Sequence, residues 1–300
     1  MMAIKRIASS VYTVIRDAVE GYSRDQATHF AAAMAFYAVF AVAPLILIAT
    51  AVTGLVWGPE AARTEVVTQV EAFVGPEARA FIVRLLENWQ DRSSGIIATV
   101  VGGVTTAYLA FRVFDALRDT LNTIWRVRLR SDLSWASHIR KYLRSFVIML
   151  LVGPMLLVST VMVEVFTRIG PFMKRWTGLD LDIGGAPYFA ITVFLLTLVF
   201  GVVYKWLPDV LIQWRDVWFG AAVTALFFSI GRSLIAYYMA HATTASLFGA
   251  AGSLVVLLFW IYYSAQIIFF GAEITQVYAR RYGKGIQPDD TAIRIEYETG

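Results

Sequence analysis

Four polar side chains lie within long apolar stretches of the sequence: Glu164, Arg232, Gln266 and Glu273. An ionisable group in the hydrocarbon core of a membrane is costly unless it finds a partner, and such groups commonly mark the paths of ions, protons or polar substrates. We therefore take these four residues as the candidate intramembrane site. The chemistry that they indicate is binding or transport, because none of them belongs to a catalytic or metal-ligand motif.

The spacing of these residues suggests two arrangements. Arg232 and Glu164 fall at similar predicted depths and could pair across a helix bundle. Alternatively, Arg232 extends toward the membrane surface and Glu164 lies among the lipid headgroups. Gln266 and Glu273 are seven residues apart and so share one face of a helix. Glu273 either takes part in transport or bonds a neighbouring helix or a basic loop residue.

A second candidate site is basic. The stretch 112–144 contains eight Lys and Arg residues but only three acidic ones. Its candidate contacts for anionic lipid headgroups are Arg126, Arg128, Arg130, Arg140 and Lys141. The same surplus is what the positive-inside rule requires of a short cytoplasmic loop, so topology alone also explains it. RNA binding would need an aromatic stacking platform, which this stretch lacks.

The residues give little support for catalysis. His29, His138 and His241 lie in different regions and have no metal-ligand spacing, and the chain has no cysteine. No nucleophile elbow, Walker loop or dinucleotide-binding glycine motif is present. We therefore predict no catalytic, metal or cofactor-binding residue, and we expect that the protein is not an enzyme.

The elements that must position the polar residues are membrane helices. Of the 300 residues, 58% are hydrophobic and 16% are charged, a balance that excludes an ordinary soluble domain. Six apolar stretches are long enough to span a bilayer as helices. They are about 27–57, 94–112, 144–166, 186–207, 216–240 and 251–279. We predict an all-α polytopic membrane protein, with residues 1–282 forming a single integral membrane domain.

Charge sets the expected orientation. With six spans both termini share one side, and 18 of the 26 Lys and Arg residues fall on that side, against 7 on the other. By the positive-inside rule both termini are cytoplasmic. Residues 1–25 carry charges throughout and show no cleavable signal sequence. The expected location is the bacterial inner membrane.

Three segments outside the spans carry their own patterns. Residues 4–22 have the apolar periodicity of an amphipathic helix in the membrane interface, although a partly ordered arm is an alternative. The first outer loop, 58–93, predicts two amphipathic helices broken at Gly75–Pro76. Residues 283–300 are polar, and we expect a disordered cytoplasmic tail.

Four blocks of the sequence resemble the signature segments of the YihY/BrkB family of bacterial inner-membrane proteins. They are AAAMAFYAVFAVAPLILI, AYLAFRVFDALRDTLNTIWRV, YKWLPDVLIQWRDVWFGA and GSLVVLLFWIYYSAQIIFFGAEIT, in that order. The resemblance covers about residues 25–280 and implies a six-span helical fold with cytoplasmic termini. It also implies that the family's polar and turn positions are Arg118, Asp119, Asn122, Pro208, Arg215, Gly271 and Glu273.

The resemblance leaves the function open. The family has carried a virulence-factor name and an older ribonuclease label, and the residues give no chemical support for a ribonuclease. We predict a transporter or flippase-like protein for a lipid or another amphipathic envelope molecule, with membrane lipids as partners. The alternative is a non-transporting scaffold or assembly factor that docks an envelope protein through the loop 58–93. We expect no nuclease activity and no nucleic-acid partner.

Overall fold

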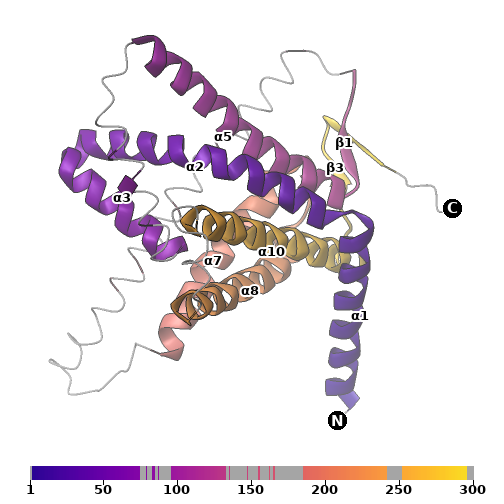
Figure 1. The fold of residues 1–300 in the computed structure, drawn as a ribbon. Helices are drawn as coiled ribbons and strands as arrows, with labels where there is room; N and C mark the ends of the chain where they lie inside the picture. Colours follow the sequence, from indigo (N-terminus) through magenta and orange to yellow (C-terminus); the bar gives the residue numbers. More distant parts are fainter. Residues whose placement is uncertain are drawn as a thin grey trace. The chain divides into compact units, whose positions relative to one another are not determined.

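The protein is mainly helical (Figure 1). The computed structural model describes residues 2–74, 96–132, 185–241 and 252–295, with isolated positions at 79, 83–84, 87, 135, 147, 155, 162 and 165. The helices of these ranges are α1 (Met2–Arg24), α2 (Ala27–Trp57), α3 (Pro59–Val74), α5 (Ile96–Ile124), α7 (Ala186–Trp206), α8 (Trp214–His241) and α10 (Gly252–Tyr282). The strands are β1 (Val127–Leu129), β2 (Val210–Leu211), β3 (Gln287–Pro288) and β4 (Ala292–Arg294).

The long helices coincide with predicted spans. Within the described residues, three stretches are long and apolar enough to cross a bilayer: Pro187–Trp206, Trp214–Leu234 and Leu257–Tyr282. They lie in α7, α8 and α10. Helix α2 covers the first predicted span, 27–57, from end to end. The third predicted span, 144–166, lies outside the described residues except for isolated positions. An all-α membrane protein is thus confirmed in outline.

Helix α5 differs from the prediction. The apolar stretch 94–112 ends at Arg112, but the helix continues for three further turns to Ile124. Charged residues end an apolar run without ending a helix, because Arg, Leu and Ala all have good helix propensity. The extension carries Arg118 and Asn122.

Glycine and proline set the boundary between α2 and α3. Helix α2 ends at Trp57, and Gly58 follows with φ +84°, the left-handed conformation that glycine adopts most easily after a helix. The Gly58 N–H donates to the Gly54 carbonyl at 2.9 Å. Pro59 then occupies the first position of α3, where its missing N–H has no cost. The predicted break at Gly75–Pro76 lies outside the described residues, and α3 ends just before it.

The chain divides into two compact units. The first comprises Met1–Ala27, Arg118–Ser229 and Ile267–Gly300, and the second comprises Thr28–Leu117 and Ile230–Gln266. Helices α5, α8 and α10 each contribute to both units. The site geometry below belongs to the first unit unless stated otherwise.

In the first unit, helix α1 packs against the end of α10. Val14 and Ala18 form a buried cluster with Ile274 and Val277. A different apolar row of α1 remains on the surface, with Tyr12, Ile15 and Val19 exposed. The helix predicted over residues 4–22 is confirmed, and it presents one face to α10 while leaving a second apolar face uncovered.

The C-terminal segment corrects one prediction. Composition predicts disorder for 283–300, yet residues 287–294 form two strands. Strand β3 pairs with β2 in the α7–α8 connection, and β4 pairs antiparallel with β1 after α5. These short ladders tie together two connections that are distant in sequence. Strand pairing with partners elsewhere in the chain is invisible to local composition.

Candidate functional site

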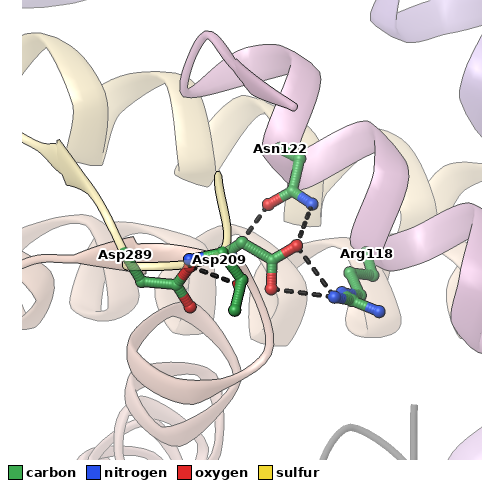
Figure 2. Close-up of polar contacts among 5 residues, drawn as sticks. Arg118, Asn122, Asp209 and Asp289 are labelled. Carbon is green, nitrogen blue, oxygen red and sulfur yellow. Dashed lines mark hydrogen bonds and ion pairs between the residues drawn. The ribbon is translucent and has the colours of Figure 1, made fainter. Parts of the chain in front are cut away.

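A buried polar network lies where α5, the α7–α8 connection and the C-terminal segment meet (Figure 2). Arg118 and Asn122, one turn apart on α5, both point toward Asp209. The Arg118 Nη2 atom lies 2.9 Å from each carboxylate oxygen of Asp209. The Asn122 amide donates to Asp209 Oδ2 at 2.8 Å and accepts from the Asp209 N–H at 2.9 Å.

This network also reaches the C-terminal segment. The Asp289 N–H donates to the Asp209 carbonyl at 3.1 Å, next to the pairing of β2 with β3. Arg118 is 2% exposed and Asp209 is 3% exposed, so the ion pair is shielded from solvent. A buried charge pair held by hydrogen bonds fixes geometry more than it adds net stability. We interpret the Arg118–Asp209 ion pair as the contact that positions the surrounding elements.

The helices of the first unit approach closely through small residues. The Tyr204 hydroxyl of α7 donates to the Ile268 carbonyl of α10 at 2.6 Å and lies 2.9 Å from Thr224 Oγ1 of α8. A Cβ placed on Gly271 would lie 1.7 Å from Thr224 Oγ1, and one on Gly220 would lie 1.7 Å from Thr275 Oγ1. Glycines at these crossings therefore allow α8 and α10 to touch at their backbones.

Glu273 lies on α10, two residues after Gly271. Its side chain is 0% exposed, and neither carboxylate oxygen has a hydrogen-bond partner among the described residues. It faces α1, where a Cβ on Gly21 would lie only 2.7 Å from Glu273 Oε2. Its charged neighbours are Asp25, Arg24 and Arg126. Of the three predicted polar residues that the structure describes, Glu273 is the most deeply buried.

The turn after α5 brings Arg126 to this place. The Trp125 indole N–H donates to the Ala272 carbonyl at 3.1 Å, and the Gln276 amide donates to the Ile124 carbonyl at 2.8 Å. Arg126 has φ +57°, which is uncommon for a bulky residue. Burial lowers the pKa of its guanidinium, and the neighbouring positive charge of Arg24 lowers it further.

The other predicted lipid contacts do not lie with Arg126 in the buried turn. Arg128 and Arg130 are exposed, beyond the buried turn. Arg130 Nη2 lies 2.7 Å from Asp132 Oδ2, and this hydrogen bond raises the pKa of Arg130 and lowers the pKa of Asp132. Arg140 and Lys141 lie outside the described residues.

The four predicted intramembrane residues are not all described together. Glu164 lies outside the described residues, so its pairing with Arg232 stays a prediction. Arg232 on α8 and Gln266 on α10 are half-buried members of the second unit, whereas Glu273 belongs to the first. In the part of the chain that the structure describes, no three His, Asp or Glu side chains gather in a metal-binding arrangement.

Sequence reasoning missed two acidic residues of this region. Asp209 follows Pro208, the turn position that the resemblance indicated, and it completes the Arg118–Asn122 network. Asp25 lies in the turn between α1 and α2 and is 7% exposed. Both stand in connections between helices, where a solvated carboxylate is the ordinary expectation. The available signal for Asp209 was the unmatched Arg118 and Asn122 on one helix face.

Comparison with known proteins gives one family. A family model described as virulence factor BrkB matches residues 18–295. A UPF0761 membrane protein of Ralstonia nicotianae is 30% identical over 195 residues, which is 64% of this chain and 42% of that protein. A second, of Alkalilimnicola ehrlichii, is 26% identical over 92% of this chain and 62% of its own length.

A third UPF0761 membrane protein, of Mannheimia succiniciproducens, is 25% identical, over 85% of this chain and 86% of that protein. The chain thus spans between about two fifths and two thirds of the first two relatives and most of the third. No solved structure matches this chain.

Proposed function

Because the chain belongs to the virulence factor BrkB family of membrane proteins, we propose that it moves a lipid or another amphipathic envelope molecule across the bacterial inner membrane. The observation that carries this proposal is Glu273. It is fully buried on a helix long enough to span a bilayer, and its carboxylate oxygens have no partner among the described residues. A group in that position is costly to keep and is characteristic of transport paths.

Two further features support a lipid-like cargo. Arg128 and Arg130 are exposed just beyond α5, where they would attract anionic headgroups. Helix α1 exposes Tyr12, Ile15 and Val19, a face suited to the membrane interface. The basic surface would gather headgroups on the cytoplasmic side, and the buried polar group would serve their passage.

Transport is testable in liposomes that contain a headgroup-labelled phospholipid. We expect the purified protein to move the label between leaflets, and we expect Glu273→Gln or Arg232→Ala to slow this movement by about tenfold or more, a barrier change of about 1.4 kcal/mol. The matched control is Glu20→Gln, because Glu20 is an exposed residue of α1. Flux that survives both site substitutions would contradict the role of these residues. No flux for any headgroup, together with a co-purified envelope protein, would favour the scaffold alternative.

Lipid contact has its own measurement. Native mass spectrometry in mild detergent should detect retained anionic phospholipid, and the double replacement of Arg128 and Arg130 by Gln should reduce that retention several-fold. The matched control replaces Arg63 on α3 and Arg84 by Gln, because both lie in the predicted outer loop 58–93. Equal losses in both double variants would show that retention is nonspecific.

A further inference from the structure

The carboxyl group of Glu273 lies against Gly21 of α1. A Cβ on Gly21 would lie 2.7 Å from Glu273 Oε2 and 3.2 Å from its Cδ. The glycine on α1 therefore makes room for the carboxyl group of α10.

Asp25 is the second carboxyl group at this place. It is the neighbouring carboxyl group of Glu273 and is 7% exposed. Its Oδ1 atom accepts from Arg24 Nε at 3.2 Å. Its Oδ2 atom and both oxygens of Glu273 have no donor among the described residues. Ionised carboxylates only accept hydrogen bonds, so two of them in contact cannot satisfy one another.

The surrounding groups limit what the missing ligand can be. The guanidinium groups of Arg24 and Arg126 are neighbours of Glu273, and Arg280 is a further neighbour of Arg126. These positive charges oppose the binding of any cation, a proton included, whereas burial and the contact between two carboxyl groups favour a proton. A proton needs no coordination shell and turns one carboxyl group into a donor for the other. It is therefore the cation that fits this place.

We propose that Glu273 and Asp25 form a proton-binding site, in which the protonated Glu273 carboxyl donates a hydrogen bond to Asp25 Oδ2. One proton is taken up from solution and no bond other than O–H forms or breaks. The site is defined by its own geometry. Its use as the coupling site of transport rests on the proposed function above.

The proton would also hold α1 in place. Helix α1 contacts α10 through the apolar cluster of Val14 and Ala18 and through an ion pair between Asp17 and Arg281. With the proton bound, the carboxyl pair adds a hydrogen bond to this contact. Without it, two negative charges would meet in a buried place and repel. Protonation and docking of α1 are therefore linked.

Infrared spectroscopy of the reconstituted full chain tests the site directly. At neutral pH exposed carboxyl groups are ionised, so a carbonyl-stretch band of a protonated carboxylic acid that shifts in D₂O would report a buried acid. We expect this band in the unmodified protein and in Glu20→Gln, and its loss in Glu273→Gln. Gln keeps the shape of the side chain and its N–H can donate to Asp25, so this variant should remain folded. In Asp25→Asn the band should shift, because its hydrogen-bond acceptor has changed.

Absence of the band in the unmodified protein, or its persistence unchanged in Glu273→Gln, would overturn the proton site. A band that does not shift in Asp25→Asn would overturn the pairing with Asp25. The measurement needs no transport. An intact band with no lipid flux would therefore reject the proposed function alone, and flux without the band would reject the proton site alone.

Discussion

Replacement of Asp209 by Ala is expected to lower the free energy of unfolding by about 3–5 kcal/mol. The change leaves the Arg118 guanidinium buried without the carboxylate that lies 2.9 Å from its Nη2 atom. It also removes the acceptor of the Asn122 amide. An uncompensated buried charge costs far more than the net contribution of the pair. Reversible denaturation of the purified protein in detergent, compared with the unmodified chain, measures the difference.

Asp132→Ala provides the matched control. This residue also pairs with an arginine, Arg130, at 2.7 Å, but both side chains are exposed to solvent. Exposed ion pairs add little stability, so we expect no measurable change. Replacing Arg118 and Asp209 together by Met and Leu should recover much of the loss, because no charge is then left buried. Equal destabilisation by Asp209→Ala and Asp132→Ala would refute the buried network.

The helix positions were largely predictable from the sequence. A chain in hydrocarbon must satisfy its own backbone, so an apolar run of sufficient length specifies a helix almost by itself. The predicted span 216–240 corresponds to α8, Trp214–His241, and 251–279 corresponds to α10, Gly252–Tyr282. The same argument does not locate the end of α5, because hydropathy reports the edge of the membrane and not the end of a helix.

The site was only half predictable. Glu273 was identified because a carboxyl group in an apolar run is conspicuous, and Arg118 and Asn122 were identified through the resemblance. Their partners were not. Asp209 lies 91 residues from Arg118 in the sequence, and Asp25 lies in a short polar turn. Burial of these two carboxyl groups depends on which elements pack around them, and local patterns carry no information about that packing.

Strands β3 and β4 also depend on partners that are distant in the sequence. Each is only two or three residues long, too short to form without a partner. Their partners β1 and β2 lie in connections more than 75 residues earlier in the chain. A polar composition predicts disorder because it lacks apolar surface to bury. Here backbone hydrogen bonds to β1 and β2 stabilise the segment instead.

The second large effect concerns Gly271. Replacing it by Ala is expected to destabilise the protein by about 3 kcal/mol, at the upper end of the usual cost of overpacking. The added Cβ would lie 1.7 Å from Thr224 Oγ1 and 2.6 Å from the Tyr204 hydroxyl. Both atoms are held by hydrogen bonds, since Thr224 Oγ1 donates to the Gly220 carbonyl at 2.7 Å and the Tyr204 hydroxyl donates to α10. Neither can move aside without losing a bond.

Gly201→Ala is the control for this substitution. Gly201 also lies inside a helix of the first unit, but the nearest atom to its added Cβ would be 3.8 Å away, an ordinary contact. We expect that variant to be as stable as the unmodified protein or more so, by up to about 1 kcal/mol, because Ala favours the helix. Thermal denaturation of the two variants in one detergent separates the effects. Similar stabilities of the two variants would mean that α8 and α10 lie further apart than the Gly271–Thr224 contact requires. The position of Glu273, two residues along the same helix, would then also have to be revised.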